Sequence, residues 1–515
     1  MIFNFSQLKA HIHLPHFQNE VKTVKFAAGI LLLILAIWVL LKSRGKSPVA
    51  KLGGLSWKRN QFCRGWLITG DTGSGKTSSG INQLAHQVFQ NEPKWGGLCV
   101  DEKGVYWETL AAMARHYGRE NDLIHLQIHD DNTDAQLPPT HRYNLTGDRS
   151  IPFSTYAKFV VDTATSLGQG GDKGFFKSQA QTHIAYALEM LYELNLPVTL
   201  LGAYELLSDP EKLETEMANL ENLNETPRRI AVHAHFFDRF ITQPAEQFGG
   251  VRETIGNYLQ YFLTPGVAEV FCTGESTFHF SAIDSGKIIL TTMPQKFQTE
   301  RRYVNTFLKL LFYNHALRRF DKSKADRSKA NLLILWADEA QRFMTASEDG
   351  TSDYNCVDVI REAGATVVAA AQSTTSLIPP LGNDKSKVLT LNLRNRMVFR
   401  SADEADAVQA ADFIGKKRVV KRSWGYNGGN RQAPGGAVRH EANAGLLSAA
   451  AQVRADEFPV IVVTGFSEAI AAAGGSREPS SNTLAHQFVC RQFSGNSAGQ
   501  KVERGVCAVR TADSL

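Results

Sequence analysis

This chain of 515 residues has no closely spaced cysteines and no strong charge of one sign. It also has no more than one long apolar run. Its six cysteines lie far apart without any C-x-x-C pair, which excludes a zinc ribbon and a disulfide framework and suits a reducing compartment. The formal net charge is only +5, so any surface that binds nucleic acid must be local. The length allows two or three domains with a large core.

One long apolar run is present, FAAGILLLILAIWVLL, from Phe26 to Leu41. Counted from Val24, it would be about 27 Å long as a helix, enough to cross a thin hydrocarbon core. Basic residues flank both ends and are more frequent after the run, so the positive-inside rule places residue 42 onward in the cytoplasm. A buried core helix is the alternative, and the long segment before the run disfavours a cleaved signal peptide. We predict one transmembrane anchor at about 24–41.

The stretch GWLITGDTGSGKTSSG, residues 65–80, contains the phosphate-binding pattern G-x-x-x-x-G-K-[S/T]. Apolar residues 66–68 predict a buried strand, and residues 78–90 have helical spacing, so backbone N–H groups and a helix N-terminus would face the phosphates. Lys76 would reach the β- and γ-phosphates, and the Thr77 hydroxyl would hold Mg²⁺. A chance glycine-rich turn is the weaker alternative. The predicted cradle consists of Gly70, Asp71, Thr72, Gly73, Ser74, Gly75, Lys76, Thr77 and Ser78.

A second apolar strand, predicted for residues 332–337, ends in Asp338 and Glu339. The carboxyl end of such a strand is where an α/β sheet places its catalytic groups. Asp338 would coordinate or orient the Mg²⁺ shell, and Glu339 would polarise the attacking water. A small-molecule kinase does not need the second carboxylate, so the pair favours ATP hydrolysis coupled to work.

A third predicted strand starts at Ala365 and ends at Gln372. Gln372 would contact the γ-phosphate and report hydrolysis, although an ordinary polar strand end is an equal explanation. Arg361 precedes this strand. It is either an arginine finger directed at a neighbouring subunit's nucleotide or a surface arginine.

The pattern of apolar residues in the rest of the chain predicts an α/β nucleotide-binding domain with a mostly helical domain inserted in it. Apolar residues at helical spacing and prolines between segments indicate the insertion. A cationic, aromatic loop at 416–426 suits phosphate contacts and base stacking, with a solvated hairpin as the alternative. The predicted parts are an N-terminal segment with the anchor (1–48), the nucleotide-binding domain (49–151 and 281–466), the helical domain (152–280) and a flexible tail (467–515).

The motifs ITGDTGSGKT, LCVDEKG, YNL, LLILWADEAQ and AAAQS occur in this order. Together with the N-terminal anchor they resemble the type IV secretion coupling proteins of the VirD/TraD/TraG kind, which belong to the FtsK/HerA group of RecA-like motor ATPases. The resemblance covers about residues 50–465. The family has proline where this chain has Glu102, and many members have two membrane helices. We assign no chemical role to Asp101.

The resemblance implies a RecA-like P-loop fold and an ATPase of the bacterial inner membrane, single-pass here, with most of the chain in the cytoplasm. Family members are thought to form hexamers that bring DNA, with a relaxase or another secreted protein, to the channel. Their motif residues correspond to Lys76, Thr77, Asp338 and Glu339. Gln372 would be the sensor, and Arg361 would act in trans.

The sequence thus predicts ATP-driven recruitment and translocation of DNA, with single-stranded DNA as the expected substrate and ATP and Mg²⁺ as ligands. An FtsK-like translocase of double-stranded DNA is one alternative, although its several membrane helices and winged helix are not evident. A receptor that docks substrates, with nucleotide only stabilising its assembly, is another. A small-molecule kinase is the weakest.

Overall fold

The computed structural model describes residues 47–129, 141–168, 174–400 and 406–408, together with five short strands further along the chain. The chain divides into two compact units between Pro48 and Val49, and the fold described here is that of the second unit. The predicted anchor at 24–41 lies outside the described residues. Within the described part, no helix combines the length and the apolar character needed to cross a bilayer.

The described strands form a 10-stranded sheet in the order β14-β13-β12-β9-β3-β8-β7-β4-β6-β5. The strands from β12 to β5 are parallel, and β13 and β14 continue the sheet antiparallel. In chain order the strands are β3 (Trp66–Thr69), β4 (Gly96–Asp101), β5 (Leu123–Gln127), β6 (Ile288–Thr292), β7 (Leu333–Asp338), β8 (Ala365–Ala371), β9 (Asn395–Val398), β12 (Val460–Thr464), β13 (His486–Arg491) and β14 (Ala508–Val509). This confirms the predicted α/β class and the strands predicted around the motifs.

The central strands are apolar because helices cover both faces of the sheet. Every residue of β7 and β8 is buried. Successive side chains of β3 alternate, so that Trp66 and Ile68 join one core while Leu67 joins the other. The first core contains residues of α3 (Asn82–Asn91) and α4 (Tyr106–His116), and the second contains those of α12 (Gln298–Arg318).

Shorter elements complete this part of the chain. Two hairpins pair β1 with β2 and β10 with β11. Their strands and the remaining helices are β1 (Ala50–Leu52), β2 (Leu55–Trp57), β10 (Val419–Arg422), β11 (Gly436–Arg439), α2 (Arg59–Phe62), α13 (Lys324–Lys329), α14 (Asp353–Cys356), α15 (Ile378–Leu381) and α16 (Asn383–Asn392). Only the strand β10 of the predicted cationic loop at 416–426 is described, so its contacts with a ligand stay a prediction.

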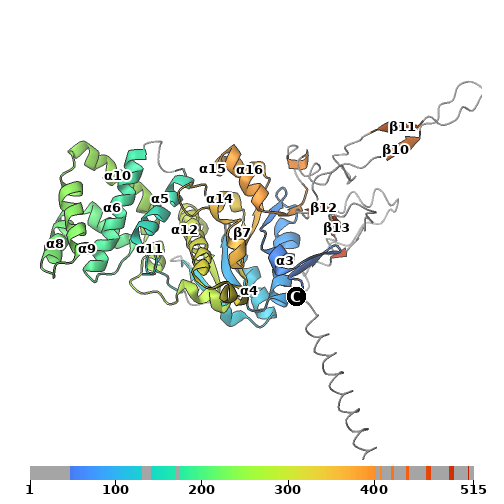
Figure 1. Ribbon diagram of the computed structural model, residues 1–515, viewed down its shortest axis with the longest axis horizontal. Coiled ribbons are helices and arrows are strands. Elements are labelled where there is room, and N and C mark those ends of the chain that lie inside the picture. Colours follow the sequence, from blue (N-terminus) through green and yellow to red (C-terminus); the bar gives the residue numbers. More distant parts are fainter. Residues whose placement is uncertain are drawn as a thin grey trace, which may run out of the picture. The chain divides into compact units, whose positions relative to one another are not determined.

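In the described part of the chain, seven α-helices lie between β5 and β6, where the sequence predicts the helical insertion (Figure 1). Prolines begin three of them, and the Asp209 and Thr226 side chains cap two of these. Helices α5 and α10 contact α12, and the insertion shares one core with that face of the sheet. The helices are α5 (Phe153–Ser166), α6 (Gly174–Glu193), α7 (Leu200–Ser208), α8 (Pro210–Glu221), α9 (Pro227–His235), α10 (Ala245–Leu263) and α11 (Pro265–Phe271).

Two segments differ from the sequence prediction. Helix α12 begins at Gln298, whereas its apolar spacing predicts a start at Tyr303, because its polar first turns bind a neighbouring loop instead of the core. The predicted flexible tail, 467–515, contributes β13 and β14, which pair with β12 and with each other.

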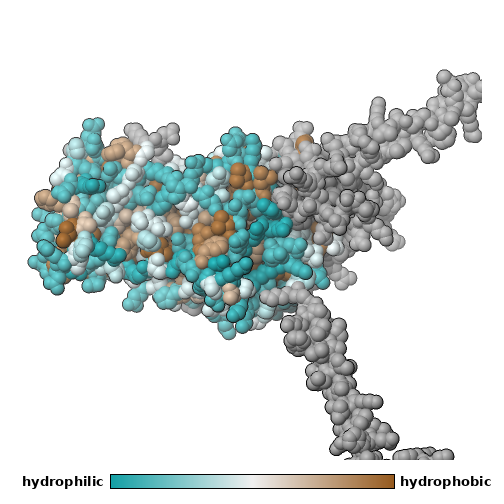
Figure 2. All heavy atoms as spheres, viewed as in Figure 1, coloured by the Kyte–Doolittle hydropathy of each residue, from teal (hydrophilic) through white to brown (hydrophobic). Residues whose placement is uncertain are grey.

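The surface in Figure 2 is largely hydrophilic, with apolar side chains in a few places, including the region of α15 and α16. On α16, Val388 and Leu391 are 38% and 51% exposed. Isolated exposed apolar residues are ordinary for a folded protein and do not define a site by themselves.

Two histidines meet in the core of the helical insertion. His183 Nδ1 lies 2.9 Å from His235 Nε2, and both rings are buried. The Tyr186 ring stacks on His235 at a centroid distance of 3.8 Å. Burial lowers the pKa of His183 to about 4 and that of His235 to about 3. The pair is therefore neutral at physiological pH, with one ring donating and the other accepting.

We expect acid to destabilise the insertion through this pair. Below pH 6.5, the ordinary histidine pKa, the unfolded chain takes up protons that the folded pair does not accept. The free energy of unfolding is therefore unaffected by the titration of this pair above pH 6.5. Below that pH it falls by about 1.4 kcal/mol per histidine and pH unit, down to about pH 4. Urea unfolding followed by circular dichroism at pH 7 and pH 5.5 measures the loss. The variant His183→Gln/His235→Gln should lose less stability over this interval, and an equal loss would contradict the assignment.

Candidate nucleotide site

The phosphate loop connects β3 to a helix, as predicted. Gly73 and Gly75 have φ values of 78° and 93°, a left-handed conformation that suits glycine. Gly70 allows close packing, because a Cβ there would lie 2.6 Å from both Phe399 Cβ and Ser74 Oγ. Residues Lys76–Ile81 form a π-helical turn that continues as α3, so the helix after the loop begins two residues earlier than Ser78 and is not uniformly α-helical.

Lys76 lies over its own loop. Its Nζ donates to the carbonyl oxygens of Gly70 and Asp71 at 2.7 and 2.8 Å. Partial burial lowers its pKa, and the carboxylates of Asp338 and Glu339 oppose that shift. The ammonium group is thus held by carbonyl oxygens at the mouth of the loop, beside the acidic strand end.

The two halves of the predicted metal site meet. Thr77 Oγ1 donates to Asp338 Oδ2 at 2.9 Å, although the residues are 261 positions apart in the chain. Asp338 is buried at the end of β7, and burial raises the pKa of its carboxyl group, against the hydrogen bond from Thr77. A hydroxyl and a carboxylate in contact are the oxygen donors that Mg²⁺ prefers.

Glu339 follows directly and occupies a left-handed conformation, with φ 51° and ψ 45°. Its backbone N–H donates to Asp338 Oδ1 at 3.0 Å. Its carboxylate lies 3.5 Å from Lys103 Nζ, with 19% of the Glu339 side chain exposed. A non-glycine residue in this conformation stores strain of about 1–3 kcal/mol, and such strain concentrates at functional sites.

The DEKG segment after β4 has structural roles that the motif alone does not reveal. The Asp101 carboxylate accepts from the backbone N–H groups of Lys103, Val105 and Tyr106, at 3.0, 2.8 and 2.9 Å, and so stabilises the start of α4. Glu102 is buried and accepts from Arg302 Nε at 2.9 Å. An ion pair to α12 therefore fixes the loop at the position where the resemblance predicts proline.

Gln372 and Arg361 fall at opposite ends of β8. Gln372 is exposed beyond the carboxyl end, and its carbonyl oxygen accepts from the Gly70 N–H at 3.2 Å, which places it beside the phosphate loop. Arg361 precedes the strand, and with Arg64 and Arg394 it lines a cavity of about 490 Å³. Arg361 therefore lies at the edge where the strands begin and does not join the nucleotide site of its own chain.

One contact of the loop was missed by the sequence reading. Arg400 Nη2 lies 3.0 Å from Asp71 Oδ2, and the Asp71 N–H donates to the Arg400 carbonyl at 2.8 Å. Arg400 follows β9, the neighbour of β3 in the sheet. Its place directly after a predicted strand was a signal, but strand order was needed to use it.

The cradle fits a nucleotide with Mg²⁺. Within the described residues, Asp71 Oδ1 and Ser74 Oγ are buried without a hydrogen-bond partner. Loop glycines, an ammonium group and a hydroxyl–carboxylate pair surround them. In the same part of the chain, no group of three or more His, Cys, Asp or Glu side chains is arranged to bind a metal alone. The Thr77–Asp338 pair suits Mg²⁺, which usually combines one or two protein ligands with phosphate oxygens and water.

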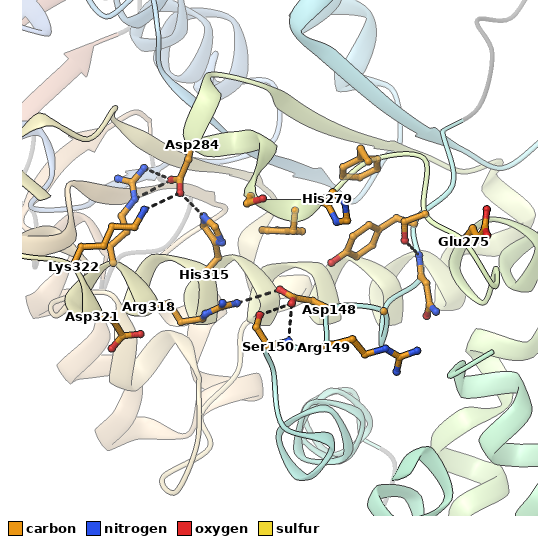
Figure 3. Close-up of a pocket in the computed structure, with 18 of the residues that line it drawn as sticks. Asp148, Arg149, Ser150, Glu275, His279, Asp284, His315, Arg318, Asp321 and Lys322 are labelled. Atoms are coloured by element: carbon orange, nitrogen blue, oxygen red, sulfur yellow. Dashed lines mark hydrogen bonds and ion pairs between the residues drawn. The ribbon is translucent and has the colours of Figure 1, made fainter. Parts of the chain in front are cut away.

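A second cavity, of about 710 Å³, lies before the start of β6 (Figure 3). Asp284 contacts Arg319 and, at 3.2 Å, His315, while Asp148 lies 3.1 Å from Arg318. The dashed contacts in Figure 3 show these two charged clusters on its wall. This edge of the sheet is opposite to the one that carries Lys76, so the cavity is not part of the nucleotide site.

Fold and site together define a P-loop nucleotide-binding protein with a mostly parallel, RecA-like sheet. Residues 209–444 match the family described as the type IV secretion-system coupling protein DNA-binding domain. This match confirms the resemblance to the type IV secretion coupling proteins that the motifs predicted. A search among curated proteins found no significant match.

Solved structures of a coupling protein share the fold. The bacterial conjugative coupling protein TrwBdeltaN70, in complex with sulphate, superposes with a TM-score of 0.54 at 16% identity, over 77% of this chain and 82% of that one. Plasmid coupling protein TrwB in complex with the GTP analogue GDPNP gives 0.52 at 16% identity, over 73% and 80%. Its complex with ADP and Mg²⁺ gives 0.51 at 16% identity, over the same shares of 73% and 80%.

Proposed function

We propose that this protein is a membrane-anchored, Mg²⁺-dependent ATPase that couples ATP hydrolysis to the recruitment and translocation of DNA, or of a protein–DNA conjugate, through a type IV secretion channel. The observation that carries the proposal is the 2.9 Å contact between Thr77 and Asp338, with Lys76 and Glu339 beside it. A strand end and a phosphate loop that meet in this way are the two halves of a hydrolytic nucleotide site.

In this mechanism the chain positions the phosphates and the attacking water. Lys76 turns from the loop carbonyls to the β- and γ-phosphates, while Thr77 and Asp338 would hold Mg²⁺. The ion, when bound, neutralises negative charge on the phosphate oxygens. Glu339 orients the attacking water and accepts its proton. Gln372, exposed beside Gly70, would sense the γ-phosphate.

The DNA part of the proposal rests on two observations. Residues 209–444, which include helices of the insertion, match a domain described as DNA-binding. The segment 416–426 has five basic residues with Trp424 and Tyr426 close behind, a composition that suits phosphate contacts and base stacking. Single-stranded DNA is the substrate that we propose.

Assembly and location belong to the same proposal. A homo-hexamer at the bacterial inner membrane, anchored by residues 24–41 and with the bulk of the chain in the cytoplasm, would deliver a relaxase or another secreted protein to the channel. In such a ring, Arg361 would act on the nucleotide of a neighbouring subunit. Its position outside the site of its own chain is compatible with that role.

The test is ATP hydrolysis by the full chain in detergent, with and without a single-stranded oligonucleotide, at low and moderate salt. We expect stimulation by DNA that weakens as salt rises, because phosphate contacts release counterions. Lys76→Ala should abolish ATP hydrolysis both with and without the oligonucleotide.

Hydrolysis that is indifferent to DNA at high protein concentration, where rings would form, would contradict DNA translocation and favour a docking receptor. Hydrolysis that survives in Lys76→Ala would show a contaminating enzyme. Substitution of Lys94, an exposed lysine before β4, is a matched control that should leave the rate unchanged.

A further inference from the structure

Glu339 needs a partner because of where the chain places it. The register pairs Asp101 with Asp338 at the ends of β4 and β7, and Glu339 comes next, so three carboxylates gather at one edge. Glu339 also has a left-handed backbone, which only Asn195 shares among the non-glycine residues described. Repulsion between these carboxylates disfavours the position of the Glu339 side chain unless an opposing charge lies nearby.

Lys103 supplies the opposing charge. Its Nζ lies 3.5 Å from Glu339 Oε1, and within the described residues it is the one cationic group at ion-pair distance from this carboxylate. The Lys103 side chain is 60% exposed, so the contact is not a by-product of core packing. The Lys103 charge also acts on Lys76. Burial is the main cause that lowers the pKa of Lys76, and the charge of Lys103 lowers it further.

The loop that carries Lys103 is held by the first turns of α12. Arg302 Nε and Gln298 Nε2 donate to Glu102 Oε1 at 2.9 and 3.1 Å. Gln295, in the turn before α12, donates to the Lys103 carbonyl at 2.5 Å. The lysine backbone is therefore fixed even though its side chain is exposed.

The same turns of α12 touch the helical insertion. Thr264 Oγ1, between α10 and α11, donates to Glu300 Oε1 at 3.2 Å. Helix α12 thus connects the insertion, through Glu102, to the loop that faces Glu339.

We propose that Lys103 is a positioning residue that holds the Glu339 carboxylate in place for hydrolysis, and that α12 fixes Lys103 through Glu102. This rests on the proposed ATPase function. It adds a residue that neither the phosphate loop nor the acidic strand end contains.

The test compares Lys103→Met and Lys103→Arg in steady-state ATP hydrolysis by the full chain. Loss of a positioning contact should lower kcat about tenfold, because a small misplacement of a catalytic group is costly, with KM for ATP unchanged. Arginine restores the charge and should recover most of kcat. Lys94→Met, at the opposite end of β4, is the matched control.

Two further variants locate the effect. In a Glu339→Gln background, Lys103→Met should not lower kcat further, because the carboxylate that Lys103 positions is already absent. Glu102→Gln removes the charge that holds Arg302 and should lower kcat less than Lys103→Met does. Circular dichroism establishes that each variant is folded.

The outcomes separate this inference from the function on which it rests. A wild-type chain that binds ATP without hydrolysing it overturns the proposed function and the inference with it. If the wild type hydrolyses ATP, three results overturn the inference alone. These are a Lys103→Met chain that keeps the wild-type kcat, a Lys103→Met chain that raises only KM, and a Lys103→Arg chain that loses as much kcat as Lys103→Met.

Discussion

Replacing Glu339 with glutamine should lower kcat for ATP hydrolysis by at least about a hundredfold, because the side chain keeps its shape but no longer accepts a proton. ATP binding should persist, since Lys76 and Thr77 are unchanged. Hydrolysis is measured by phosphate release, and binding by the fluorescence of a labelled ATP analogue.

A matched variant sharpens this prediction. Glu348→Gln makes the same change at a glutamate that is 71% exposed and paired with Lys385, after β7 on the same segment, and should leave kcat unaltered. Retained hydrolysis in Glu339→Gln would remove this residue from the chemistry. Loss of both binding and hydrolysis would assign it to the cradle.

Removing the Asp353 carboxylate should cause the largest loss of stability. Lys309 is buried in contact with Asp353, with side chains 1% and 0% exposed, and the Tyr313 hydroxyl donates to Asp353 Oδ1 at 2.6 Å. Burial lowers the pKa of Lys309, and Asp353 opposes the shift. Asp353→Ala leaves that ammonium unpaired in the core, which should lower the free energy of unfolding by about 3–5 kcal/mol. Urea unfolding measures the loss.

An exposed ion pair provides the comparison. The Arg115 and Glu120 side chains lie 3.2 Å apart and are 68% and 58% exposed. Glu120→Ala should therefore lower the free energy of unfolding by less than about 1 kcal/mol. Removing both buried charges with Lys309→Met/Asp353→Leu should recover part of the loss, because no unpaired charge remains. If Asp353→Ala costs no more than Glu120→Ala, the buried pair does not stabilise the fold.

This buried pair also bears on the site. Lys309 Nζ donates to the Phe343 carbonyl at 2.5 Å, and Asp353 Oδ2 accepts from the Thr345 N–H at 2.7 Å. The first contact ties the segment after Glu339 to α12, and the second joins that segment to the start of α14, which Lys309 also contacts. The middle of α12 therefore contacts the segment that follows the acidic strand end, while its first turns hold the loop that carries Lys103.

Features that depend on local pattern could be predicted from the amino-acid sequence. The phosphate loop, the strand before it and the acidic end of β7 follow from glycine spacing and apolar runs, and each was predicted within one or two residues. Helices between β5 and β6 could likewise be anticipated, because apolar residues there repeat at helical spacing and prolines begin three of the helices.

Which of these elements meet could not be predicted, because it depends on how the whole chain folds. Strand order brings β7 near β3, so that Thr77 contacts Asp338 across 261 positions, and it places Arg361 at the other edge of the sheet. The start of α12 and the Lys103–Glu339 pair were equally hidden, because their polar residues respond to partners far along the chain. Hydrophobic periodicity records which side of an element is buried, whereas the pairing of charges depends on distances that only the folded chain sets.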